Sequence, residues 1–585
     1  MKWPRFAMVF SIVVLLISGQ IALAATEDEQ WVARENFTKT FHAVVMESSI
    51  DPMLTFPLLT GQSAPKNEPL KFDRYVCKTT SDVGCNTVDF YHFNAPLPIC
   101  SNESQLDCIE SVQGGLENQN LSPATFNSYL YKNHPDQFQS NPKLGIPYAE
   151  SPSVWNINAA PHNFGSEYVV SASVIADVFP DGSTNWTRNE VSAYLMPISR
   201  IKSGAKNLID CKTIEDRPGL HNNGCNTVVE PVNPEDYCAF GSNSSGTLDC
   251  LTPHAFPTNS NFRIILRLSK EPTSWLHGRL VNPVMDISKY GSGIRVSVQA
   301  SPTRVPVIYY GDYWEKMADS AKQFWQQCED AVFRCNGAGM FAEPLPVRTG
   351  TMHMFSYGNG ALAAVNMITK LTNDKAIVVP SAWSFHSLPS DQMEGANNCF
   401  KSGEGLKGIV TTNSTAYSEG PPTFANGELQ YHVAAPHFNS DGSIFKGNYD
   451  LVIRSDVARC LYGFSNAPIS AAISIVTESG NQDLATTLVR ESDGWIFLSA
   501  KNFTFSSPVI SVKFNQEKVT VVTPPAQVKS EPTKSELNKE VVATPTNLPI
   551  SKTPTKSTIT CIKGKVIKKV TAIKPVCPSG FKKKA

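Results

Sequence analysis

The chain has 585 residues, and beyond its first 25 it lacks any apolar run long enough to cross a bilayer, which takes about 20 residues. It also lacks a net charge of either sign, because 51 lysines and arginines face 52 aspartates and glutamates, leaving a formal net charge of -1. The small net charge argues against a dedicated nucleic-acid-binding protein. A hydrophobic content of 41% argues against wholesale disorder. The length suggests three or four domains of roughly 100–200 residues each.

Short catalytic and metal-binding motifs are absent as well. The sequence contains no H-E-x-x-H, no G-x-S-x-G, no P-loop and no C-x2-C pair. We therefore expect no cofactor and no metal ion. Asn439, Asp441 and Gly442 resemble half of a calcium loop, but the rest of the spacing is missing, so an ordinary turn is favoured.

The 11 histidines form no ligand pattern. His432 and His437 are more typical of surface or hydrogen-bonded core residues than of ligands. Catalytic groups meet in space and not in sequence, so a secreted hydrolase acting on polysaccharide or peptide stays possible. Its active site would lie in residues 305–445, with His353 and His386 as candidates.

The first 24 residues have the features of a secretory signal peptide. Lys2 and Arg5 precede an apolar run from Phe6 to Ile17, and Ala22-Leu23-Ala24 supplies a cleavage site of small residues. An uncleaved anchor helix is the rival interpretation, but a run of about a dozen apolar residues is short for a span. We expect a secreted or extracellular protein that remains associated with the cell surface.

All 14 cysteines follow this segment, an even number that suits an oxidising compartment. Most are sequence neighbours, so the simplest hypothesis is seven disulfides, six of them local and one between Cys399 and Cys460; spacing alone leaves the connectivity open. The local pairs would be Cys77–Cys85, Cys100–Cys108, Cys211–Cys225, Cys238–Cys250, Cys328–Cys335 and Cys561–Cys577.

The first two groups of four cysteines look like copies of one another. The segments Cys77–Thr79, Gly84–Val88 and Leu106–Cys108 recur as Cys211–Thr213, Gly224–Val228 and Leu248–Cys250. A period of about 140 residues predicts tandem domains rather than a solenoid. We therefore expect β domains at residues 25–160 and 161–308, with disulfide-bonded loops that either present a recognition face or only stabilise long connections.

Alternation of apolar and polar residues predicts strands in both copies. The segments are Phe41–Met46, Phe90–Phe93, Tyr168–Asp177, Phe262–Leu268 and Ile294–Val298.

Residues 309–445 are expected to form a mixed α/β region. An amphipathic pattern predicts a helix over 314–332, and a second short helix is expected at Ala361–Leu371 after the turn-rich Gly358-Asn359-Gly360. Strand-like segments follow at Ala376–Val379 and Gly408–Thr411.

Residues 446–516 are expected to form a small β-sandwich module, because turn signals separate short strand-like segments. These segments are Tyr449–Arg454, Ile469–Thr477, Thr487–Arg490, Trp495–Leu498 and Val509–Phe514.

The end of the chain is basic. Residues 517–558 form a linker rich in Pro, Thr and Lys, and 559–585 form a tail that a Cys561–Cys577 disulfide would close. Residues 551–585 contain ten lysines and no acid, so the preceding 550 residues carry 41 bases against 52 acids. A cationic tip suits an anionic cell-wall polymer, although it could serve solubility alone. The lysines proposed to bind the polymer are Lys563, Lys565, Lys568, Lys569, Lys574, Lys582, Lys583 and Lys584.

Two regions carry a resemblance. Residues 449–467 (YDLVIRSDVARCLYGFSNA) and 494–508 (GWIFLSAKNFTFSSP) resemble a module of uncharacterised secreted actinobacterial proteins. The lysine-rich, two-cysteine end, from Thr560 to Lys584, is similar to a tail on many exported proteins of these bacteria. The resemblance implies an exported cell-envelope protein and no catalytic residues.

Tryptophans give the last functional signal. Trp155, Trp186, Trp275, Trp383 and Trp495 lie in or near polar, turn-rich stretches, where an exposed ring could stack on a sugar; burial in a β-sandwich is the commoner role. Taken together, the sequence predicts a mainly β, multidomain protein. The favoured hypothesis is a noncatalytic binding or surface protein, held by its tail and with a possible glycan or protein ligand.

Overall fold

The computed structural model describes a large part of the chain. Residues 41–45 and the described parts of 201–252 and of the tail are placed by backbone alone. The described residues are 41–45, 57–63, 73–117, 119–130, 136–181, 189–210, 220–221, 226–229, 247–272, 275–323, 350–354, 357–388, 391–393, 395–401, 405–418, 420–465, 469–476, 482–483, 486–505, 509–516, 557–563, 566–572 and 582–583.

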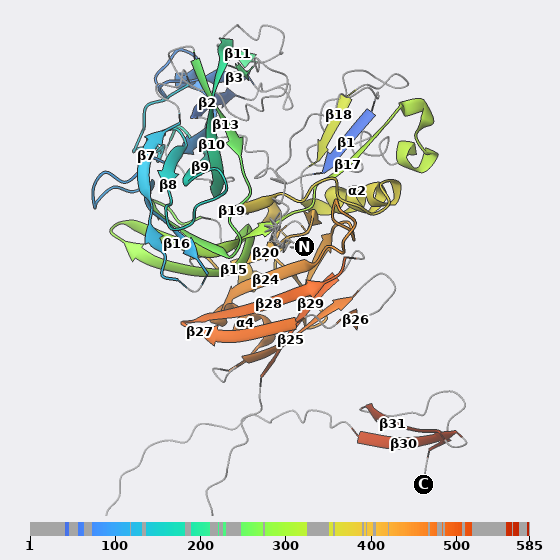
Figure 1. Cartoon of the computed structure of the whole chain (residues 1–585). Helices are drawn as coiled ribbons and strands as arrows, with labels where there is room; N and C mark the ends of the chain where they lie inside the picture. The colour runs from blue at the N-terminus through green and yellow to red at the C-terminus, as the bar shows by residue number, and fades with distance from the viewer. Residues whose placement is uncertain are drawn as a thin grey trace, which may run out of the picture. The chain divides into compact units, whose positions relative to one another are not determined.

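The protein is mainly β and divides into two compact units, Met1–Val519 and Thr520–Ala585 (Figure 1). The expected signal peptide and residues 517–556 of the expected linker lie outside the described residues.

The largest sheet of the first unit closes on itself. Its strands are β2 (Leu58–Ser63), β3 (Asp73–Val76), β4 (Phe90–Pro96), β5 (Cys108–Leu116), β6 (Ser122–Pro123), β7 (Thr125–Tyr129), β8 (Ser153–Asn156), β9 (Glu167–Val178), β10 (Asn189–Asp210), β11 (Leu220–His221), β12 (Asn226–Val229), β13 (Thr247–Pro253), β14 (Ser260–Leu268), β15 (Trp275–Tyr290), β16 (Gly293–Arg304), β19 (Ser381–Ser387), β20 (Gly408–Thr412), β24 (Gly447–Arg454), β27 (Thr486–Ser492) and β28 (Trp495–Phe503).

Among the described residues, this unit also contains two smaller sheets and several helices. One sheet has the order β17 (Ile308–Asp312), β1 (Phe41–Val45), β18 (Gly350–Met354), and helix α2 (Gly358–Leu371) packs against it, as Figure 1 shows. The other sheet comprises β21 (Ala416–Tyr417), β22 (Thr423–Ala425), β23 (Glu428–Ala434), β29 (Val509–Gln516), β25 (Ile469–Val476) and β26 (Gln482–Asp483). The short helices are η1 (Cys85–Thr87), η2 (Trp314–Lys316), η3 (Asp391–Met393), α3 (Asn398–Lys401) and α4 (Ser455–Tyr462).

Alternation of apolar and polar residues produces the strands as expected. In β14, Phe262, Ile264 and Leu266 are at most 1% exposed, whereas Arg263 between them reaches the other face of the sheet. Strands cover all of the strand-like segments named above except Ala376–Val379, where only Val378 forms an isolated bridge to Val307. Of the helix expected over 314–332, the described part consists of η2 and a helical turn at 319–323.

The two proposed copies share their sheet. Strand β4 of the first pairs with β9 of the second, and β5 pairs with β14 over eight register positions. Residue 160 therefore does not separate two sheets, because long-range pairing joins the segments on either side of it. Most of the second copy's cysteine-bearing segments lie outside the described residues.

A β-sandwich occupies the C-terminal part of this unit. Strands β20, β24, β28 and β27 face the sheet of β21–β23, β29, β25 and β26 across one apolar core, which includes Leu451, Leu498, Tyr431 and Ile510. The sandwich therefore begins near residue 408 and not at 446, because β20 and β23 supply strands to its two sheets. It also contains α4, which ends at Gly463 in the left-handed conformation.

The described residues contain three disulfides, Cys77–Cys85, Cys100–Cys108 and Cys399–Cys460. They match three of the seven pairs expected from sequence. The side chains of the other eight cysteines lie outside the described residues: Cys211, Cys225, Cys238, Cys250, Cys328, Cys335, Cys561 and Cys577.

Candidate functional site

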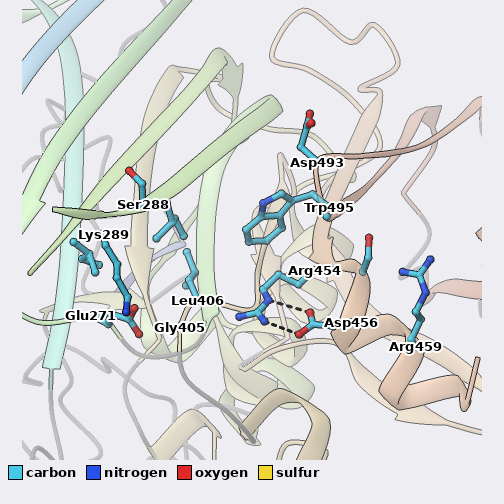
Figure 2. A pocket seen from close by; sticks show the side chains of 14 residues that line it. Glu271, Ser288, Lys289, Gly405, Leu406, Arg454, Asp456, Arg459, Asp493 and Trp495 are labelled. Atoms are coloured by element: carbon cyan, nitrogen blue, oxygen red, sulfur yellow. Dashed lines mark hydrogen bonds and ion pairs between the residues drawn. The ribbon is translucent and has the colours of Figure 1, made fainter. Parts of the chain in front are cut away.

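The candidate site is a pocket of about 650 Å³ between the β15–β16 hairpin and the sandwich. Figure 2 shows its two walls, with Glu271, Ser288 and Lys289 on one side and Trp495, Arg454 and Asp456 on the other. The walls come from segments more than 180 residues apart, since Glu271 and Arg454 both line the pocket.

Arg454 ends strand β24 and Asp456 lies in the first turn of helix α4, so a strand-to-helix junction places both charges at the pocket. The guanidinium donates through Nε to Asp456 Oδ1 at 3.0 Å and through Nη2 to Oδ2 at 2.5 Å, a two-pronged ion pair (Figure 2). Burial raises the pKa of the Asp456 carboxyl, but the hydrogen bonds and charge of Arg454 outweigh burial and leave that pKa below its usual value. Asp456 therefore stays ionised at neutral pH.

One turn further along α4, Arg459 pairs with Glu491 of β27 at 2.8 Å and donates to the carbonyl oxygen of Ser465 at 3.0 Å. Burial raises the pKa of Glu491, and the hydrogen bond and charge of Arg459 bring it below its usual value. These contacts fix the helix to the sandwich strands beside the pocket.

Trp495 opens strand β28 directly opposite Arg454 in the β24–β28 register. The preceding turn suits its sequence, because Asp493 and Gly494 adopt positive φ angles of 53° and 79°. The indole is partly buried against the neighbouring core and borders the pocket. It is the aromatic ring in this pocket's lining.

The floor of the pocket is apolar, and the backbone of the loop at Gly405 beside it disfavours a side chain. Leu406 and Ile294 are 3% and 7% exposed. Gly405 has a φ of 81°, and a Cβ there would lie 3.4 Å from Arg454 Nη1, so a side chain would be strained and would crowd the guanidinium. The loop is tied to the sandwich where the Arg454 amide donates to the Lys407 carbonyl at 2.9 Å.

The charges of the pocket balance. Lys289, Arg454 and Arg459 face Glu271, Asp456 and Asp493, and both arginines are already paired with carboxylates. A polyanion would find little uncompensated positive charge here. An aromatic ring beside planar hydrogen-bonding groups suits instead a neutral, hydroxyl-rich ligand with apolar C–H faces.

None of the histidines considered from sequence is among the described residues that line this pocket. His386 is half-buried on β19, with its ring 5.5 Å from that of His277. His437 pairs with Asp374, and His432 is exposed on β23. The side chain of His353 lies outside the described residues.

The tryptophans divide between core and pocket. Trp155, Trp275 and Trp383 are 6%, 0% and 1% exposed and belong to the core, whereas Trp495 lines the pocket. Trp186 lies outside the described residues. Among the four of these tryptophans that the structure describes, Trp495 thus keeps the sugar-stacking role open.

The tail lysines are placed by backbone alone. Strand β30 (Ser557–Lys563) pairs with β31 (Val566–Ala572) and with β32 (Lys582–Lys583), which contain Lys563, Lys568, Lys569, Lys582 and Lys583. Lys565, Lys574 and Lys584 lie outside the described residues.

Sequence reasoning missed Arg454, Asp456 and Glu271 as site residues, because nothing in their spacing reveals that they meet. The available signal was local: Ser455-Asp456 ahead of Val457, Ala458 and Leu461 is a helix start followed by an apolar stripe. This signal would have predicted helix α4 and placed Asp456 in its first turn.

Among the described residues, no cluster of three or more His, Cys, Asp or Glu side chains could hold a metal ion. Asn439 and Asp441 form an ordinary turn, in which the Ser443 amide donates to Asp441 Oδ1 at 2.8 Å. No helix in the described ranges is both long and apolar enough to cross a membrane.

Comparison with known protein families finds no match, and no curated protein matches the chain.

Proposed function

We propose that this is an exported, envelope-associated and noncatalytic binding protein whose pocket at Trp495 takes a neutral glycan. The observation that carries the proposal is the indole of Trp495 opposite Arg454 in one strand pair, beside the Arg454–Asp456 ion pair. The ring offers a flat apolar surface, and the ion pair offers fixed donors and acceptors for hydroxyl groups.

The disulfides support an oxidising compartment, and with it an extracellular location. The tail supports attachment to an anionic cell-wall polymer, because ten lysines and no acid occupy residues 551–585. We further propose membership of the secreted actinobacterial family that the sequence resembles, and descent of the two cysteine groups from one duplicated segment.

The alternative is a secreted hydrolase with its active site in residues 305–445. A general acid needs a raised pKa, whereas the pKa of Asp456, which lines the pocket, is lowered, as is that of Glu491 on the neighbouring strand β27. A raised carboxyl pKa occurs at Asp450, but this residue is 2% exposed and does not line the pocket. Binding without turnover therefore fits the pocket better than hydrolysis.

A glycan array probed with the mature chain tests the proposal, with turnover of each bound glycan followed in the same assay. We expect binding of neutral glycans without cleavage. The variant Trp495→Ala should bind at least tenfold more weakly, equivalent to about 1.4 kcal/mol, because the stacking surface is lost. Arg490→Gln is the matched control, since Arg490 is exposed on β27 and does not line the pocket.

Two outcomes would count against the proposal. Cleavage of a bound glycan would favour the hydrolase, and unchanged affinity of Trp495→Ala would remove the pocket from the binding surface. Thermal unfolding of both variants shows whether lost binding reflects lost folding.

A further inference from the structure

A second hollow lies on the opposite face of the β15–β16 hairpin from the Trp495 pocket. The strand order β5–β14–β16–β15 gives a sheet with its core side chains on one face. Residues Ile294 and Ile287 point to the Trp495 pocket, and Arg295, Ser297 and Gln299 line the other hollow, of about 240 Å³. Because side chains alternate along a strand, one hairpin borders both.

Arg263 is the centre of this second hollow. It lies between Gln113 and Gln299 in the register of β5, β14 and β16. Its Nε donates to Gln299 Oε1 at 3.0 Å, its Nη2 donates to the same oxygen, and its Nη1 donates to Gln113 Oε1 at 3.4 Å. Two neutral amides thus hold the guanidinium flat across the strands.

These bonds leave a defined pair of donors. A guanidinium has five N–H groups, and three are used, so one remains on Nη1 and one on Nη2. That end-on pair matches the two oxygens of a carboxylate. No carboxylate pairs with Arg263 in the part of the chain that the structure describes.

Two neighbouring arginines differ from Arg263 because each of them pairs with a carboxylate. Arg267 and Arg295 both pair with Glu110, at 2.8 and 2.5 Å, and these contacts outweigh burial to lower the pKa of Glu110. Both guanidinium groups are therefore engaged by a carboxylate within the sheet, and the single Glu110 charge balances one of the two. The charge of Arg263 is held by amide oxygens alone, which leaves it available to a ligand.

The rest of the hollow limits what the ligand can be. Asp286 is exposed, lies opposite Ser297 in the register and lines the same space, so it would accept hydrogen bonds from hydroxyls and repel a dense polyanion. Val284, 44% exposed, and Ile265 offer apolar contact to C–H groups.

We infer that this hollow binds one carboxylated sugar unit, a hexuronate, of an acidic polysaccharide. The sugar carboxylate accepts from the free end of Arg263, and ring hydroxyls bond to Asp286 and Ser297. The inference does not rest on the proposed function, because it concerns a different face and a different class of sugar.

Calorimetric titration of the mature chain with trigalacturonate and with its methyl ester tests the inference. The two probes share their rings and differ in charge and in the methyl groups of the ester. We expect the acid to bind at least tenfold more tightly than the ester, and the difference to shrink as salt is raised. Arg263→Gln should abolish the preference, because glutamine keeps a planar polar group but lacks the charge.

Asp286→Ala is a second variant at an exposed position, expected to fold normally and to weaken binding of the uncharged ester, for which no charge repulsion is relieved. Trp495→Ala should leave acid binding unchanged, which separates failure of this inference from failure of the proposed function. Absence of acid binding, equal binding of the ester, or unchanged affinity of Arg263→Gln would each overturn it. Equal binding of a tripeptide with a free C-terminal carboxylate would overturn the sugar assignment.

Discussion

At the scale of single residues, His277 stands out because it is 1% exposed and neither ring nitrogen has a hydrogen-bond partner among the described residues. Its ring stacks on Tyr417 with centroids 3.7 Å apart, and Arg279 and His386 are the charged or titratable groups that act on it. Burial first, and then repulsion from His386 and Arg279, lower the pKa of His277 well below its usual value. The imidazole is therefore neutral in the folded protein.

Acid should weaken the fold through this residue. Above pH 6.5 the imidazole is neutral in both states; below it only the unfolded chain takes up the proton, so the free energy of unfolding falls by up to about 1.4 kcal/mol per pH unit. Between pH 7.5 and 5.5 the loss should be about 1.4 kcal/mol in total. Urea denaturation at both pH values checks this, with His277→Leu expected to show a smaller loss. Equal losses in both proteins would contradict the prediction.

At the scale of elements, the Cys399–Cys460 disulfide joins α3 to α4 over a sequence separation of 61 and brackets the loop at Gly405. In the chain-entropy model its removal costs about 4 kcal/mol, against about 2.5 kcal/mol for a separation of 8. The double variant Cys399→Ala, Cys460→Ala should therefore lose more stability than Cys100→Ala, Cys108→Ala, whose separation is 8. Urea denaturation under oxidising conditions measures both, and the reverse order would refute the loop-length argument.

Local sequence pattern was enough to predict many strands, but not which strands pair with one another. Period-two alternation identifies β9, β14 and β16, because each buries one face. Helix α4 was missed since its eight residues follow directly on β24. The β5–β14 pairing and the meeting of Glu271 with Arg454 were not predictable, because sequence spacing carries no information about contacts between such distant segments.

At the scale of the whole molecule, the near-zero net charge conceals two parts of the chain with opposite net charge. Residues 551–585 carry ten lysines and no acid, and the remaining 550 residues carry an excess of 11 acids, from 52 minus 41. The division into compact units at Val519 separates the basic end from the sandwich. The tail can therefore be removed without cutting a strand of the first unit.

A mature chain ending at Val519 should keep its glycan binding and lose its binding to purified cell walls. The full mature chain should release from the walls as salt rises from 0.05 to about 0.5 M, because the attraction is between exposed charges. A cell-wall pull-down across the salt series compares the two. Salt-sensitive binding retained by the shortened chain would place the anchor elsewhere.

The pairing of β1 also governs when the first unit can fold. Phe41 lies opposite Asp312 on one side and Gly350 on the other, so this sheet cannot assemble until some 350 residues have been synthesised. Contacts between residues so far apart in sequence slow folding. The edges of the early strands stay unpaired until their partner strands have been synthesised. We therefore expect the early strands to be the segments most exposed to aggregation during synthesis.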